Sequence, residues 1–137
     1  MVKPIVKDIL FLGQKSLPAT PADAQVITDL LDTLKANEAG CVGLAANMIG
    51  VRKCIIVFAH GPFHVPMVNP KIVKKSGPYE TEEGCLSLLG GPRKTKRYKT
   101  IKVQYQNEKF QTRIKTFKGF PAQIIQHEVD HCDGILI

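Results

Sequence analysis

The apolar residues between positions 21 and 37 recur at the spacing of an α-helix. Four of them fall three or four residues apart, which places them on one helical face: Ile27, Leu30, Leu31 and Leu34. Thr20 precedes them as a candidate N-cap, and Pro21 has a fixed φ that suits a first helical turn. The pattern therefore predicts a helix from about residue 21 to residue 37, ending before Gly40.

After this helix the pattern becomes that of extended chain. Residues 54–58 form a short apolar run typical of a buried strand. Residues 65–73 are predicted to be extended, with Pro66 and Pro70 limiting their pairing because proline has no N–H to donate.

Two further strands are predicted near the C-terminal end. Residues 98–105 alternate, with Tyr98 grouped with Ile101, Val103 and Tyr105 among polar residues, and residues 110–117 alternate less cleanly. The polar residues 106–109 between them make a plausible hairpin loop.

A second helix is expected to follow this hairpin. Gly119 and Pro121 would open it, and Asp133 and Gly134 would close it. The predicted fold is therefore α+β: one small domain, residues 1–137, with antiparallel strands around a central helix.

Composition is consistent with this architecture. The chain has 137 residues, of which 44% are hydrophobic, enough to bury one core. There is no apolar run near 20 residues and no signal-like start, so we expect no membrane partner. Four cysteines, one of them needed as a free thiolate below, suit a reducing cytoplasm better than a disulfide framework.

The net charge of +7 suggests attraction to polyanions. The densest basic run has five cations in seven positions: Arg93, Lys94, Lys96, Arg97 and Lys99. It is either a solvated loop and strand edge or a surface that attracts ribosomal RNA, in which case binding should collapse with salt. We expect no DNA partner.

The central helix carries the candidate chemistry in QHEVDH, residues 126–131. His127 and His131 are four residues apart and so lie on one face, where both can bind one metal ion, while Glu128 can reach a water beside it. The alternative is an ordinary amphipathic helix. A catalytic metal site usually has three protein ligands, and Cys85 is the best third candidate. On its own, Cys85 would more often be a small buried apolar residue.

A zincin-type protease is the rival among metalloenzymes. Its third ligand normally follows the HExxH motif, but only six residues follow His131 and none of them is His or Glu. Asp133 is the only downstream carboxylate, and it lies too near along the helix on another face.

Three segments together resemble the motifs of the peptide deformylase family: GLAA with its flanks at 41–50, EGCLSL at 83–88, and QHEVDH at 126–131. The resemblance implies hydrolysis of the formyl group from the N-terminal formylmethionine of newly made polypeptides, which would be the partners. It also implies one divalent metal ion, usually iron(II) in cells, with zinc, nickel or cobalt possible.

The family's functional residues can be carried over by position. The resemblance implies that the metal ligands are Cys85, His127 and His131. Glu128 would shuttle the proton, and the backbone N–H of Leu86 would donate to the formyl oxygen. Gly43 would face the main chain of the substrate, with Leu44 and Met48 also at the substrate site. Ile124 lies three residues before His127 and shares its helical face, where it either lines an apolar pocket for a methionine-like side chain or only packs the helix onto the sheet. Asp130 would orient a ligand or tie the helix to its neighbours.

One position departs from the family pattern. Where the family has a glutamine whose amide stabilises the oxyanion, this chain has Met48, whose thioether is no donor. Adjacency makes Asn47 a hypothetical substitute. The departure leaves three alternatives: a working deformylase, a related amidohydrolase with a different acyl substrate, or a metal-binding relative with little activity.

Overall fold

The computed structural model describes residues 1–85, 87 and 91–137. Its elements in chain order are α1 (Ile9–Leu12), a 3₁₀ turn (Pro21–Asp23), α2 (Ala24–Ala36), β1 (Gly43–Ala45), a second 3₁₀ turn (Ala46–Ile49), β2 (Ile55–His60), β3 (Phe63–Glu83), β4 (Arg93–Gln106), β5 (Thr112–Lys118) and α3 (Gly119–Cys132). In the described residues the strands form one antiparallel sheet in the order β1-β2-β3-β4-β5.

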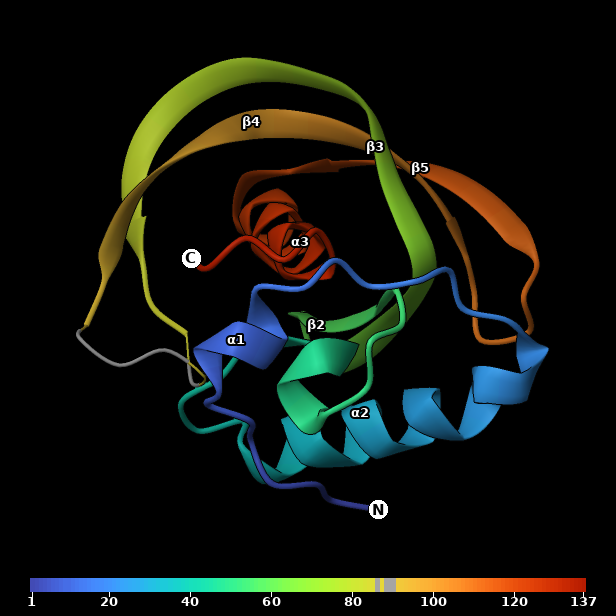
Figure 1. Ribbon diagram of the computed structural model, residues 1–137. Coiled ribbons are helices and arrows are strands. Elements are labelled where there is room, and N and C mark those ends of the chain that lie inside the picture. The colour runs from blue at the N-terminus through green and yellow to red at the C-terminus, as the bar shows by residue number, and fades with distance from the viewer. Residues whose placement is uncertain (86, 88–90) are drawn as a thin grey trace.

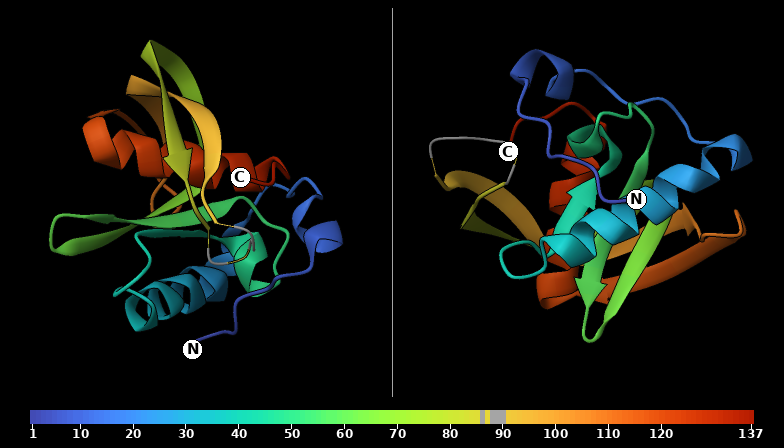
Figure 2. Two further views of the ribbon diagram at one scale, coloured as in Figure 1. Left: turned by 90° about the vertical axis from the view of Figure 1, so that its left-hand side faces the viewer. Right: turned by 90° about the horizontal axis from the view of Figure 1, so that it is seen from below.

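Helix α3 lies at the centre of the molecule. Strands β3 and β4 curve over it, and β2 separates it from α2 (Figure 1). The turned views show the same order, with the β2–β3 hairpin lying between the two helices (Figure 2). The predicted arrangement of antiparallel strands around a central helix is confirmed. No helix in the described part of the chain is long and apolar enough to cross a membrane.

Helix α2 forms where the apolar spacing predicted it. Ile27, Leu30 and Leu34 are buried on one face. The backbone N–H of Thr20 donates to the Asp23 carboxylate at 2.9 Å, so a side chain satisfies an N–H that precedes the helix. The predicted bounds are confirmed, with the first turn in 3₁₀ geometry.

Strand β3 is much longer than the predicted extended segment, 65–73. Its second half is mostly exposed, so it lacks the apolar alternation that marks a half-buried strand. Pro66 lies within the β2–β3 ladder opposite Val57, so it does not limit pairing as expected. Pro70 does coincide with a register shift between Val68 and Lys71, next to Asn69 with φ 50°.

Strand β4 begins five residues before the predicted start at Tyr98. Ile101, Val103 and Tyr105 are buried; Lys99, the next position in this phase, is exposed, and Arg97 after it is buried. Tyr98 is out of phase with these residues, because adjacent strand residues point to opposite faces, and it is only partly buried. Arg97 is therefore a buried residue, unlike the exposed lysines near it in the basic run.

Helix α3 has the predicted ends. Gly119 (φ 64°) and Gly134 (φ 75°) both adopt the left-handed conformation that favours glycine, one at each end. A side chain at Gly134 would also lie 2.7 Å from the carbonyl oxygen of Gly13. The end of the helix that carries His131 is therefore packed closely against the N-terminal segment.

Candidate metal centre and active site

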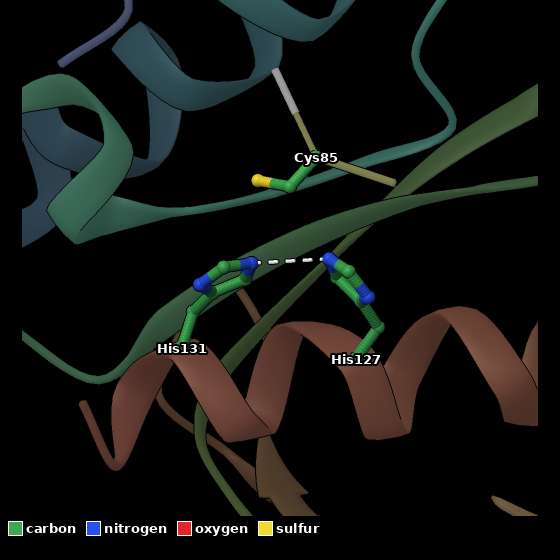
Figure 3. A group of neighbouring side chains, drawn as sticks. All are labelled: Cys85, His127 and His131. Atoms are coloured by element: carbon green, nitrogen blue, oxygen red, sulfur yellow. Dashed lines mark hydrogen bonds between the residues drawn. The ribbon is translucent and has the colours of Figure 1, made fainter. Parts of the chain in front are cut away.

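Cys85, His127 and His131 converge on one point. The two histidines project from one face of α3, and Cys85 faces them from the segment after β3 (Figure 3). The ligand atoms of these three residues all lie within 4.8 Å of one another. A thiolate and two imidazoles are a donor set that suits zinc, iron(II) or cobalt.

The histidine rings are oriented for a shared ligand. The Nε2 atoms of His127 and His131 lie 3.0 Å apart, in a hydrogen bond that a metal ion would replace. The other nitrogen of His127, Nδ1, is 2.8 Å from Glu83 Oε1. A carboxylate on Nδ1 fixes the tautomer that leaves the Nε2 lone pair for a metal. The residues present therefore fit a bound divalent ion.

Three polar contacts position α3 against its surroundings. Gln126 binds the backbone of Tyr98 on β4, accepting from its N–H and donating to its carbonyl, each at 2.8 Å. Arg97 donates to Asp130 at 2.7 Å, which confirms the expectation that Asp130 ties the helix to a neighbour. The Asn47 amide donates to the carbonyl of His131 at 3.0 Å.

The Glu83 carboxylate is the centre of a buried polar cluster. Arg97 donates to both of its oxygens, with its shortest contact at 2.6 Å, and Gln123 donates to Oε2 at 2.9 Å. Glu83 and Arg97 are only 8% and 4% exposed, so the pair is shielded from water. Glu83 ends β3, two residues before Cys85. The same residue therefore helps to place the thiol and one imidazole.

The surroundings of the two histidines shift their pKa values in opposite directions. Burial lowers the pKa of His127, but hydrogen bonds to Cys85 and Glu83 outweigh it and raise that pKa to about 10. Burial, together with the neighbouring His127 charge, lowers the pKa of His131 to about 3. Without a metal ion, His127 therefore carries the proton shared between the rings. Metal uptake should release it, because only neutral imidazole is a ligand.

Glu128 is a buried carboxyl group beside the candidate metal ligands. It follows His127 on α3, lines the cavity and is 4% exposed. Burial is the main cause that raises its pKa to about 7. Its Oε1 atom is buried and has no hydrogen-bond partner within the described residues. A carboxyl group with a pKa near neutral can both accept and return a proton.

Gly43 explains why the first motif needs a glycine. A Cβ at this position would lie 2.7 Å from Ile124 Cγ2 and 2.8 Å from Glu128 Oε2. Any side chain here would displace the wall of the site or Glu128 itself. The absence of a side chain lets β1 pass directly beside the predicted proton carrier.

A cavity of about 480 Å³ opens beside the candidate metal ligands, with Cys85 and His127 in its lining. Its walls come from residues 40–43, residues 82–85, Met48 and α3. Phe120 and Val42, 58% and 41% exposed, contribute apolar surface to it. Cys41 also lines it, but its thiol donates to the Gly43 carbonyl at 3.0 Å, and burial raises its pKa to about 11. Cys41 is thus a neutral thiol outside the metal-ligand group.

The other predicted site residues divide into three groups. Gly43, Met48 and Ile124 line the cavity with Glu128. Leu44 does not: its side chain is fully buried in the core, so only its backbone is available to a substrate. Leu86 lies outside the described residues.

Asn47 does not replace the missing glutamine. Its amide is buried against the end of α3 and donates to the carbonyl of His131. Met48 takes the cavity position, where its sulfur accepts from the Ala45 N–H at 3.5 Å. Among the described lining residues only Gln123 has a side-chain amide, and its N–H already donates to Glu83. At position 48, where the family has the glutamine, the side chain that faces the cavity therefore offers no amide donor.

Sequence reasoning missed the residues that support the ligands, chiefly Glu83, Arg97 and Gln123. Glu83 was recognised only as part of a motif, although a carboxylate beside a predicted metal ligand often binds a ligating histidine. Arg97 shares the phase of Ile101, Val103 and Tyr105 on β4, but so does the exposed Lys99, so the phase alone could not identify Arg97 as buried. Gln123 had no comparable signal.

Comparisons with known proteins agree with this geometry. The family described as Polypeptide deformylase matches residues 3–137. A peptide deformylase of Clostridium beijerinckii is 64% identical over 137 residues, covering all of both chains. Peptide deformylase 2 of Clostridium acetobutylicum is 42% identical over 128 residues, 91% of this chain and 85% of that one.

Solved structures show the same fold. The crystal structure of peptide deformylase from Thermotoga maritima has a TM-score of 0.89 at 30% identity, over 99% of this chain and 95% of that one. A class I type b peptide deformylase from Acinetobacter baumannii, solved with Met-Ala-Ser bound, has a TM-score of 0.87 at 30% identity, with 99% and 96% coverage.

The Glu83 cluster predicts a specific loss of stability in acid. Burial acts to raise the pKa of Glu83, but hydrogen bonds from His127, Arg97 and Gln123 outweigh it and lower that pKa to about 2. A lowered carboxyl pKa stabilises the fold above the unfolded-state value near 4.5, and this contribution is lost as pH falls toward 2. Between pH 5.5 and pH 3 Glu83 should account for a loss of about 2 kcal/mol.

Urea unfolding of the metal-free protein at these two pH values measures this loss. Glu83→Gln should be less stable at pH 5.5, and its stability should fall by about 2 kcal/mol less than that of the wild type on acidification. An equal fall in both proteins would show that Glu83 is not held ionised by its neighbours.

Proposed function

Since the chain belongs to the peptide deformylase family, we propose that Cys85, His127 and His131 hold its metal ion and that Glu128 carries the proton in its reaction. The protein is a metal-dependent hydrolase that removes the N-formyl group from newly made polypeptides. Of the three alternatives left by the sequence, family membership therefore favours the working deformylase. The observation that carries the site assignment is the convergence of one thiol and two imidazoles beside a buried carboxyl.

The ion should be iron(II) in cells, and zinc, nickel or cobalt would also suit one sulfur and two nitrogens. When bound, a divalent ion supplies a Lewis acid that polarises the formyl carbonyl and makes water more acidic. Glu83 holds His127 by Nδ1 so that Nε2 points to the ion. Burial of His131 keeps its ring neutral, as a ligand must be.

Glu128 takes the proton from the attacking water and returns it to the leaving amine. Its pKa of about 7 suits both steps at neutral pH. Gly43 leaves room for this carboxyl to stand against β1. The water attacks the formyl carbon, the C–N bond breaks, and formate and a free N-terminus are released.

The cavity is the proposed site for the substrate's first residue. The Acinetobacter baumannii relative was solved with Met-Ala-Ser bound, a peptide whose first residue is methionine. Ile124, Met48 and Phe120 offer an apolar wall to a methionine side chain. The backbones of Gly43 and Leu44 lie on β1, which ends the sheet order, so they are placed to pair with an extended peptide.

Met48 determines how the oxyanion is stabilised. Its sulfur accepts a hydrogen bond and has none to give. Stabilisation would then depend on backbone N–H groups, of which Leu86 is the expected one, beside the Lewis acidity that a bound ion would supply. One missing donor typically costs roughly 10²- to 10³-fold in rate.

Replacing Met48 with glutamine should restore this donor. The variant should raise kcat/KM on formyl-Met-Ala-Ser by the order of 100-fold, because glutamine has a similar size and its amide can accept from Ala45 while donating to the cavity. Initial rates of the iron(II) protein, prepared without oxygen, measure the gain. Met48→Leu is the matched control and should show none.

Glu128→Gln should retain the metal and lose turnover, both in the wild-type protein and in the Met48→Gln variant. Equal rates for Met48→Gln and Met48→Leu would mean that another group already supplies the donor. Full turnover by Glu128→Gln would remove Glu128 from the proposed role.

We also place the protein in the cytoplasm, in contact with ribosomal RNA through the outer surface of β3, β4 and β5. Lys74 lies directly opposite Lys102 in the ladder, and Lys102 lies opposite Thr116. Neither β4 nor β5 contains an acidic residue. Like charges that face each other destabilise a sheet unless an anion binds them, and phosphates would do so.

This surface differs from the basic run first considered. Lys94 and Lys96 lie opposite Glu82 and Glu80 in the ladder, so acidic neighbours offset their charge. Lys74 and Lys102 have no such neighbour in register. The second pair is therefore the better candidate for phosphate contact.

Ribosome pelleting over a range of salt concentrations tests the surface. Lys74→Gln with Lys102→Gln should weaken association and lower the slope against log salt by roughly one per lysine. Lys94→Gln with Lys96→Gln removes the same charge and should have a smaller effect. Failure of the wild type to pellet at low salt, or equal effects of the two pairs, would contradict the proposal.

A further inference from the structure

Gln123 is a polar residue in the wall of the cavity, and both ends of its amide are engaged. Its Nε2 donates to Glu83 Oε2 at 2.9 Å, and its Oε1 accepts from the Tyr79 hydroxyl at 3.3 Å. A carboxylate can only accept, so the NH₂ end must face Glu83 and the oxygen must face Tyr79. The amide thus has one satisfied orientation.

The two oxygens of the Glu83 carboxylate have different hydrogen-bond partners. Oε1 accepts from His127 and from Arg97, whereas Oε2 accepts from Gln123 and from Arg97. Gln123 holds the oxygen that His127 does not use. Hydrogen bonds therefore run in an unbroken line from Tyr79 on β3, through Gln123 and Glu83, to the imidazole of His127.

We propose that Gln123 is a positioning residue that acts on His127 through Glu83, with Tyr79 fixing the Gln123 amide. The proposal rests on the assignment of His127 as a metal ligand. Arg97 supplies the charge that keeps Glu83 ionised, and its Nε and Nη2 atoms contact both carboxylate oxygens from β4. Gln123 adds a donor to Oε2 from α3, the helix that carries His127, so the carboxylate is held from both elements with Oε1 directed at Nδ1.

The competing explanation is that Gln123 merely packs α3 onto β3. A packing role would lower the stability of the metal-free protein without depending on Glu83. A positioning role should change the metal site itself and should disappear when Glu83 can no longer hold His127. The test must therefore measure the metal and must include a double-mutant cycle.

The readout is zinc affinity, measured by competition between the metal-free protein and a chromophoric chelator. Gln123→Leu keeps the side-chain size and removes the amide, and it should weaken zinc binding about 5- to 10-fold, at or below the usual effect of an outer hydrogen-bond partner. Tyr79→Phe removes one partly exposed hydroxyl and should cost about 2-fold. Gln104→Leu, at an exposed position on β4, is the control and should have no effect.

The double-mutant cycle tests whether Gln123 acts on His127 through Glu83. In a Glu83→Gln background, Gln123→Leu should change zinc affinity less than 2-fold, and in a Gln123→Leu background Tyr79→Phe should have no further effect. The cobalt(II) form of Gln123→Leu should show altered ligand-field bands, whereas Gln104→Leu should match the wild type. The bands report ligand geometry, which a loss of packing elsewhere would not alter.

Wild-type zinc affinity in Gln123→Leu, or a loss that persists undiminished with Glu83→Gln, would overturn the proposal. If Gln123→Leu does not fold, Tyr79→Phe still decides: no change in zinc affinity would overturn it. Zinc binding that survives both Cys85→Ser and His127→Ala would instead overturn the ligand assignment, and the positioning role with it.

Discussion

A single buried ion pair, Glu83 with Arg97, determines the geometry of the active site. It joins the end of β3 to β4, and Arg97 extends it to Asp130 on α3. Removing one partner of such a pair typically costs about 3 to 5 kcal/mol, because the other charge stays buried and unpaired. Cys85 follows Glu83 by two residues, and His127 Nδ1 contacts the Glu83 carboxylate directly. The distance between the thiol and the imidazole therefore depends on the Glu83–Arg97 pair.

The remaining contacts on α3 limit how it can move relative to that pair. Gln126 binds the backbone of β4, and Asn47 donates to the carbonyl of His131, so His127 and His131 each lie within one helical turn of a hydrogen bond that anchors α3. Gly43 brings β1 up to the same helix from the other side. The site is thus held by backbone and buried side chains from four segments that are distant in sequence. This suits a metal centre that must keep one geometry through turnover.

Periodic signals predicted a large part of this arrangement, and single tertiary contacts did not follow from them. The glycines around α3 predicted the central helix, and the spacing of His127 and His131 placed both imidazoles on one face of it, because helical geometry is local. The exposed half of β3 was missed, because a strand with both faces exposed to solvent has no alternation of apolar and polar residues. Arg97 was counted as surface because charge alone says nothing of a distant partner. Asn47 was considered as a catalytic donor from adjacency, although its amide in fact binds the end of α3.

The central claim is that one sulfur and two imidazole nitrogens from Cys85, His127 and His131 hold the metal. X-ray absorption at the zinc K-edge of the loaded protein tests it most directly. The predicted result is one sulfur at about 2.3 Å and two imidazoles at about 2.0 to 2.1 Å, with the sulfur lost in Cys85→Ser. A spectrum without sulfur, or one in which the sulfur survives Cys85→Ser, would contradict the account.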